Sequence, residues 1–300
     1  MTIKLQAFKG IKDVCDAKET QPPYLREASN VDIDDEGKKV SRRPGFGAAF
    51  VAGNYHSLWP QRPTPSGLML GVTGTTLRII NPGGSTTIIR SDLAPNLTMD
   101  YVEVNGQVYY SNGQVLGFVE NQADGIFPTI SKLGGSRMPA GQIIEFYEER
   151  LYTIQGGRAT YSEPWDFGRT ALRKNILQFP GQITMWKAVK DGIYCSFGTQ
   201  TVFLQGAQPS QFIIIPVSDY AAVRGTVVKF DASLVSSNTP LQGDAVMWYS
   251  DKGPCVGLQG GLMINHGMTK YNSPANLVSG AGIVRKTTKG FYQSLTILQN

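Results

Sequence analysis

The chain has 300 residues, of which 41% are hydrophobic and only 17% are charged, and its net charge is +5. A chain of this length can bury a large core without disulfides or metal ions, and the composition excludes disorder, collagen and coiled coil. The longest apolar runs, such as Phe212–Val217, are strand-sized, so no membrane-spanning helix is expected. The 34 glycines and 17 prolines indicate many turns.

The first fifty residues differ from the rest. Proline and glycine residues such as Pro22, Pro23 and Gly10 predict an extended N-terminal arm over residues 1–50 with little core of its own. This arm begins with no sustained apolar stretch, so no signal peptide is expected. We therefore expect the protein to be made in a cytosol, with Cys15, Cys195 and Cys255 as reduced thiols.

A charged hairpin is predicted within this arm. An acidic run, Asp32–Glu36, is followed by a basic one, Lys38–Arg43. The acidic run resembles the start of an EF-hand calcium loop, but Arg43 occupies the position where calcium needs a bidentate Glu. The segment is therefore interpreted as a hairpin turn of mixed charge, with no calcium site.

From residue 51 onward, short strands separated by turns dominate the pattern. Alternating or β-branched runs recur, whereas helical spacing is rare. Asn105-Gly106 and Asp191-Gly192 provide the positive φ angles that tight hairpins need. The expected strands are Leu68–Val72, Thr76–Ile80, Thr86–Ile89, Val102–Val104, Gln107–Tyr110, Ile183–Trp186, Ile193–Ser196, Thr201–Leu204 and Phe212–Ile215.

A repeat of strand, polar turn and strand occurs six times, with turns at positions 67, 106, 150, 192, 253 and 290. Most separations are close to 40 residues, the size of a four-stranded β-propeller blade. We therefore predict an all-β protein with a β-propeller of about five to six blades over residues 51–300. The one long separation, 61 residues, predicts an insertion over residues 218–241. An ordinary β-sandwich or barrel is the alternative.

Tryptophans recur within or near these repeats. Trp186 and Trp248 occupy the same place in two copies, and Trp165 follows another copy. A large aromatic side chain at a repeated strand position is typical of packing between blades. We therefore predict that these three residues form blade core, with a ligand-stacking platform as the alternative.

Residues for catalysis or cofactor binding do not emerge from the sequence. The two histidines, His56 and His266, are too few for a zinc site of ordinary spacing, and no nucleophile elbow, P-loop or dinucleotide-binding motif is present. Tyr249–Gly253 only partly matches a sialidase Asp box. Glu148 and Glu149 are adjacent, so on a strand they would face opposite sides. The expected protein is not an enzyme, and no catalytic, cofactor or metal residue is predicted.

Two segments resemble a known family. The first is the opening Glu27–Phe46, with Ala28, Asn30, Gly37 and then Arg42-Arg43-Pro44-Gly45; the second is Arg150–Phe167, with Ser162-Glu-Pro and Asp166-Phe167. Both resemble the tail structural proteins of tailed bacteriophages, especially the β-propeller nozzle or packaged-DNA stabilisation proteins of short-tailed phages. The segments around Asp191–Phe212 and Asp251–Tyr271 are similar to that group as well.

This resemblance implies a structural protein of the virion tail, made in the host cytoplasm. Copies of the chain would form a ring, usually a hexamer, below the portal and its adaptor, which retains and then conducts the genomic DNA. The partners implied are the chain itself, the adaptor, other tail proteins and transient, non-specific contact with double-stranded DNA. In this frame Arg42, Arg43, Pro44 and Gly45 are candidates for docking a neighbouring subunit or the adaptor, with a simple surface turn as the alternative.

The mild charge agrees with a channel that lets DNA pass, because every tightly held phosphate would add affinity and drag. Two other classes remain open. A receptor- or glycan-binding tail module would expose aromatics such as Trp59 or Trp165, and a propeller glycosidase would need two carboxylates in one pocket.

Overall fold

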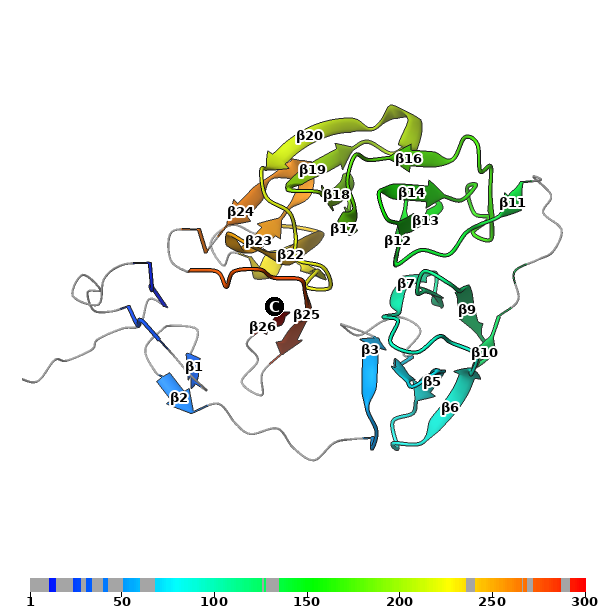
Figure 1. Ribbon diagram of the computed structural model, residues 1–300, viewed down its shortest axis with the longest axis horizontal. Helices are drawn as coiled ribbons and strands as arrows, with labels where there is room; N and C mark the ends of the chain where they lie inside the picture. Colours follow the sequence, from blue (N-terminus) through cyan, green and yellow to red (C-terminus); the bar gives the residue numbers. More distant parts are fainter. Residues whose placement is uncertain are drawn as a thin grey trace, which may run out of the picture.

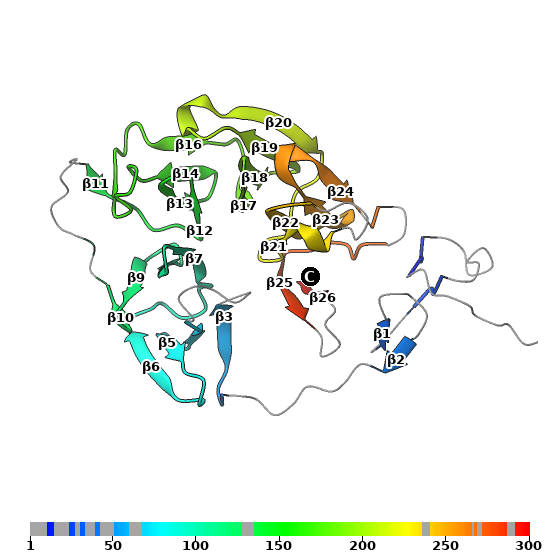
Figure 2. The same ribbon diagram turned by 180° about the vertical axis from the view of Figure 1, so that it is seen from behind.

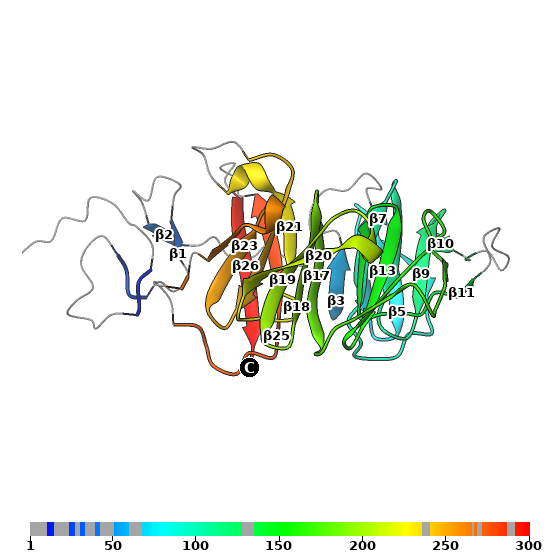
Figure 3. The same cartoon turned by 90° about the horizontal axis from the view of Figure 1, so that it is seen from above.

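The protein is an all-β propeller (Figure 1). The computed structural model describes residues 11–14, 24–27, 31–33, 40–42, 51–59, 68–125, 127, 135–235, 241–265, 267–268, 272–286 and 292–300. The sheets stand around a common centre in chain order, and their strands run across the thickness of the ring (Figure 3). The sequence-based prediction of an all-β propeller is confirmed. No helix among the described residues is long and apolar enough to cross a membrane.

Five blades are four-stranded antiparallel sheets. Their strands are β3 Tyr55–Trp59, β4 Leu70–Thr73, β5 Thr76–Ile80 and β6 Thr86–Arg90; β7 Asp100–Val104, β8 Gln107–Ser111, β9 Leu116–Glu120 and β10 Ala123–Asp124; β12 Ile143–Tyr147, β13 Arg150–Gln155, β14 Arg158–Tyr161 and β16 Ile176–Gln178; β17 Ile183–Val189, β18 Gly192–Phe197, β19 Gln200–Gln205 and β20 Ile213–Ser218; β21 Val228–Asp231, β22 Asp244–Ser250, β23 Gly253–Gly257 and β24 Met263–Asn265.

Smaller sheets complete the described structure. The sixth blade contains β25 Ser279–Lys286 and β26 Tyr292–Gln299, the arm carries β1 Val31–Ile33 and β2 Val40–Arg42, and β11 Ser136–Arg137 pairs with β15 Arg169–Thr170. Three short 3-10 turns are η1 Pro209–Gln211, η2 Ala232–Leu234 and η3 Gln259–Gly261. In each complete blade the strands lie side by side from the centre of the ring to its rim, with β6, β10, β16, β20 and β24 outermost (Figure 2).

The core lies between neighbouring blades. One cluster, which includes Leu77 and Tyr110, joins the first two blades, and another, with Leu116 and Leu151, joins the second to the third. Trp186 lies between the third and fourth blades, and Trp248 between the fourth and fifth; each is only 1% exposed. Burying one such apolar side chain contributes about 1.5–3 kcal/mol of stability. The contacts between neighbouring blades therefore stabilise the ring from the first blade to the fifth.

Tight turns join the first and second strands of the blades, as the repeat predicted. Asn105 and Gly106 adopt φ angles of 51° and 79°, the left-handed pair that a two-residue hairpin needs. Glu148 and Glu149 do the same at 43° and 63° between β12 and β13. These two glutamates therefore form the turn that the repeat placed at position 150, and the Trp165 backbone N–H donates to the Glu149 carbonyl there at 2.8 Å.

The expected insertion over residues 218–241 is wrong. This stretch contains β21, the strand of the fifth blade nearest the centre, followed by η2. The repeat turn at position 253 joins the second and third strands of its blade, whereas the other described turns join the first and second. For the same reason Trp186 and Trp248 are not equivalent, because they lie on the first strand of one blade and the second strand of the next.

A charged cluster joins the inner strands of three consecutive blades. The Ile144 N–H on β12 donates to Asp100 Oδ2 on β7 at 2.9 Å, and Lys187 Nζ on β17 lies 2.7 Å from Glu145 Oε2 on β12. Glu145 is 3% exposed, so the ammonium group of Lys187 lies against a buried carboxylate. Burial raises the pKa of Asp100, and the Lys187 charge opposes this rise.

We expect Lys187→Met to lower the free energy of unfolding by about 3–5 kcal/mol at neutral pH, because it leaves a buried carboxylate without its cation. The folded-state pKa of Asp100 lies above its ordinary value, so this group favours folding at acid pH and loses that contribution as pH rises through the folded pKa. Removing Lys187 raises that pKa further, so the loss of stability caused by Lys187→Met becomes smaller at acid pH.

Urea unfolding at several pH values measures this loss of stability, with Lys190→Met on the exposed surface as the control. A loss of stability that does not change with pH would contradict the prediction.

Candidate functional site

The sixth blade is incomplete. Among the described residues it consists of β25 and β26 alone, paired over eight positions from Ser279↔Gln299 to Lys286↔Tyr292, whereas the other five blades have four strands each. Propeller blades usually have four strands. β25 contacts β21, the strand of the fifth blade nearest the centre of the ring. The third and fourth strands of a complete sixth blade would therefore lie on the other side, beside β26.

One face of this hairpin packs against the fifth blade. The edge of β25 is held as well, because the Gly280 N–H donates to the Arg224 carbonyl at 2.8 Å, next to a bridge between Arg224 and Ser279. A Cβ at Gly282 would lie 2.5 Å from the Thr226 carbonyl oxygen and 2.8 Å from Val228, so only glycine permits this approach. The hairpin is therefore fixed on one side and can present its outer edge in a defined direction.

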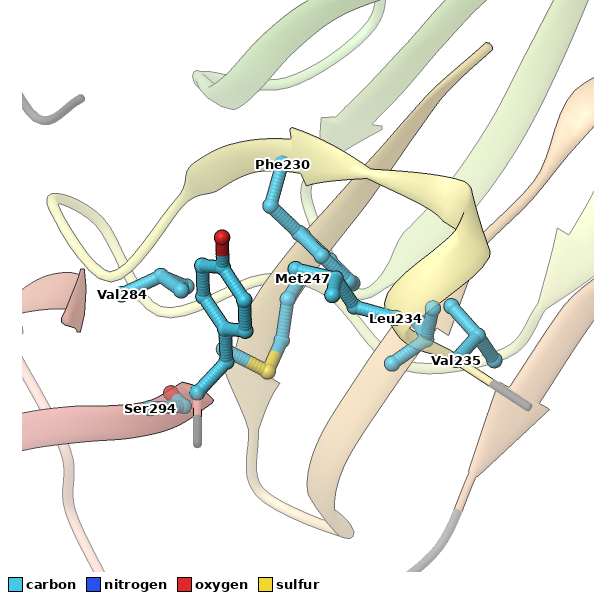
Figure 4. A pocket seen from close by; sticks show the side chains of 8 residues that line it. Phe230, Leu234, Val235, Met247, Val284 and Ser294 are labelled. Carbon is cyan, nitrogen blue, oxygen red and sulfur yellow. The ribbon is translucent and has the colours of Figure 1, made fainter. Parts of the chain in front are cut away.

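An apolar groove remains where the two blades meet (Figure 4). It has a volume of about 200 Å³ and is lined by Phe230, Leu234, Val235, Met247, Val256, Val284, Tyr292 and Ser294. Ligand pockets usually measure about 300–1,000 Å³ and place several polar groups around the ligand. This groove is smaller and mostly apolar, so it suits a protein side chain better than a small molecule.

The opposite face of the hairpin keeps apolar side chains exposed. Ala281 pairs with Ile297, and Ile283 with Leu295, so these four share the face directed away from the fifth blade. Ile297 is 75% exposed and Ile283 is 44% exposed. Leu58 on β3, in the first blade, is also 59% exposed. Large apolar side chains that stay exposed on one face of a hairpin, as Ile283 and Ile297 do, mark a surface that another polypeptide covers.

The edge of β26 carries none of the features that usually protect a free edge. Natural sheets guard edges with short strands, charged residues or proline. Among the other outer strands, β10 has two residues, β16 and β24 have three, β6 ends in Arg90, and β20 contains Pro216. β26 has eight residues without charge or proline. We call this strand edge, with the exposed Ile297, the open edge.

The arm approaches the same side of the ring. The Asn272 N–H donates to Asp13 Oδ1 at 2.8 Å, which ties the start of the arm to the segment that leads into β25. The hairpin β1–β2 lies outside the sixth blade (Figures 1 and 2) and pairs with none of the described blades. Arg42, one of the four docking candidates, is exposed at the end of β2. Arg43, Pro44 and Gly45 lie outside the described residues.

The three tryptophans have different environments. Trp186 and Trp248 lie in the core, but Trp165 is 55% exposed, so its expected core position is wrong. Trp165 is the third residue of the turn Glu163–Asp166 and has φ 56°, and its ring lies 6.0 Å from both Phe146 and Phe167. In this turn more than half of the tryptophan side chain stays exposed. The repeat could not predict the exposure of Trp165, because this tryptophan lies after the repeated strand–turn–strand unit and not within it.

Titratable groups form no site for a metal ion in the described part of the chain, which holds no cluster of three His, Cys, Asp or Glu residues. Cys195 and Cys255 are buried free thiols, and burial raises the pKa of Cys255 to about 11, so both are poor nucleophiles. His56 Nδ1 lies 2.9 Å from the Ser57 hydroxyl. His266 and Cys15 lie outside the described residues. The partial Asp box at Tyr249–Gly253 spans the end of β22 and its turn.

Comparison with known proteins supports the fold. No protein-family model and no curated protein sequence matches the chain. Among solved structures, it is similar to the extracellular domain of what is described as a hybrid two-component system of B. thetaiotaomicron, with 10% identity and a TM-score of 0.51. That match covers 84% of this chain and 31% of the other, so this chain spans about a third of that structure. A WD40 domain of Neurospora crassa Pan2 matches at 9% identity, 78% and 72% coverage and a TM-score of 0.46. At 10% identity, the first of these similarities shows the fold alone.

Proposed function

We propose that this protein is a non-enzymatic structural component of a bacteriophage tail, whose copies form a ring below the portal and adaptor. The observation that supports it best is the open edge of the sixth blade. A free strand edge with exposed apolar side chains recruits another polypeptide by strand addition. Such recruitment belongs to an assembly protein, and the family resemblance of Glu27–Phe46 and Arg150–Phe167 suggests the tail as the assembly.

In this role the ring retains the packaged DNA and then conducts it. The chain would be made in the host cytoplasm and incorporated into the virion beside the adaptor and other tail proteins. Contact with double-stranded DNA would be transient and non-specific, because a net charge of +5 spread over 300 residues provides few strong phosphate contacts per copy.

Light scattering and negative-stain microscopy on the purified protein, alone and with its connector neighbours, test this proposal. We expect a closed ring of about six subunits, formed by the protein alone or on addition of the connector. Identical head-to-tail contacts between subunits can close into such a ring. A chain that stays monomeric in both conditions would contradict the proposed function.

Exposed Trp165 favours a second candidate, a glycan-binding tail module. Its indole is supported by two phenylalanines, and its backbone N–H donates to the carbonyl of Glu149, the residue before Arg150, whose Nη1 is 3.8 Å from Glu163 Oε2. A flat exposed ring beside paired polar groups can stack on a sugar face and hydrogen-bond its hydroxyl groups. If this function holds, Trp165→Ala abolishes binding on a glycan array while Trp59→Ala on β3 does not. A wild-type chain that binds no glycan would exclude it.

A further inference from the structure

We propose that the β1–β2 hairpin of a second copy of this chain adds to β26 and completes the sixth blade. This inference rests on the proposed ring assembly and names the surfaces that would join the subunits. It combines two features of the part of the chain that the structure describes: a sixth blade with two strands fewer than the other five, and a hairpin, β1–β2, that pairs with no blade.

The number of strands is complementary. The sixth blade has β25 and β26, and adding β1 and β2 gives four strands, as in the other five blades. An isolated two-stranded hairpin is only marginally stable in water, whereas a sheet of three or more strands with an apolar face is stable. Both hairpins therefore gain backbone hydrogen bonds from pairing along the open edge.

The groove between the fifth and sixth blades provides a second contact. Tyr292 and Ser294 of β26 line it together with Phe230 and Met247. A strand added beside β26 places alternate side chains on this face, next to Tyr292 and Ser294. Its volume of about 200 Å³ suits side chains from such a strand.

The position of the β1–β2 hairpin within one chain favours a second chain as the source of the hairpin that pairs with β26. The hairpin β1–β2 is a separate sheet that lies outside its own sixth blade (Figure 1), although the linker at residues 43–54 could span about 40 Å when extended. A subunit with both a donor hairpin and an open edge makes head-to-tail contacts, and head-to-tail contacts close into rings when the rotation between subunits permits.

Thiol crosslinking between two differently tagged copies tests the pairing. One copy carries Arg42→Cys on β2 and the other Ile297→Cys on β26, both with Cys15→Ser; Cys195 and Cys255 are buried and stay in place. Both substituted positions are exposed. With a short bifunctional maleimide, under conditions where rings form, we expect covalent dimers of the two tags. Ile213→Cys on β20, of the same residue type and 63% exposed, is the matched control and should give none.

Three other outcomes would overturn the inference. Crosslinking only within a chain that carries both cysteines would show that each hairpin closes its own blade. Rings without either crosslink would show that the subunits join through another surface, while the proposed function stands. Rings that form equally well after deletion of residues 1–50 would exclude the hairpin as donor. Failure to form rings at all is a different result, since it contradicts the proposed function itself.

Discussion

Replacing Trp186 by alanine is expected to lower the free energy of unfolding by about 3–5 kcal/mol, the usual cost of removing a large buried aromatic side chain. Trp186 is 1% exposed, and its ring lies 5.7 Å from that of Tyr152 and 5.8 Å from that of Phe179. It therefore packs the third blade against the fourth. The cavity left by alanine would lie between two blades, where the sheets cannot collapse without breaking their registers.

Two control variants sharpen this prediction. Trp186→Phe keeps most of the ring and removes an indole N–H that has no hydrogen-bond partner among the described residues, so its cost should be clearly smaller than that of alanine. Trp165→Ala removes a tryptophan that is 55% exposed and should cost about 1 kcal/mol or less. Chemical denaturation monitored by circular dichroism measures all three; equal costs for Trp186→Ala and Trp165→Ala would refute the assignment of the core.

Ile297→Lys is expected to abolish ring assembly while the chain stays folded. Ile297 is 75% exposed on the face directed away from the fifth blade, so a lysine there creates no buried charge within one chain. On the open edge, however, a lysine is the residue that natural sheets use to prevent strand addition. A strand added beside β26 would place its own side chains next to this lysine and remove part of the hydration of the ammonium group without supplying an anionic partner.

Ile213→Lys is the matched control for that variant. It replaces the same residue type at 63% exposure, on the outer strand β20 of a complete blade that contains Pro216. Light scattering with the connector present should find rings for the wild type and for Ile213→Lys, and smaller species for Ile297→Lys. If Ile297→Lys forms rings as readily as the wild type, the open edge is not the subunit interface.

The sequence predicted the repeating strands and many turns because these depend on local chemistry. Asn105-Gly106 forms a tight turn wherever two strands flank it, so its role could be read directly. Glu148-Glu149 forms the same turn without glycine, held by the contact from Trp165, a residue sixteen positions further along the chain. The repeat placed a turn at position 150, but no local rule places two glutamates at positive φ, so the residues that form this turn are seen only in the structure.

The repeat pattern also misled where it aligned non-equivalent strands. Trp186 and Trp248 look equivalent because each precedes an Asp and a Gly within a few residues, yet they belong to different strands of their blades. The incomplete sixth blade shows the same limit. A hairpin has the same sequence pattern whether or not two further strands follow it, so the open edge appears only when the blades are compared in space.

Hydrogen exchange along Tyr292–Gln299 tests the central claim most directly, because amide protection reports whether a strand edge is paired. In a dilute monomer we expect the outward-facing amides of β26 to exchange fast and those of β19, which pairs on both sides, to exchange slowly. In assembled rings the β26 amides should become protected, together with those of Val31–Ile33 and Val40–Arg42. Protection of β26 already in the monomer, or fast exchange that persists in the ring, would contradict the account.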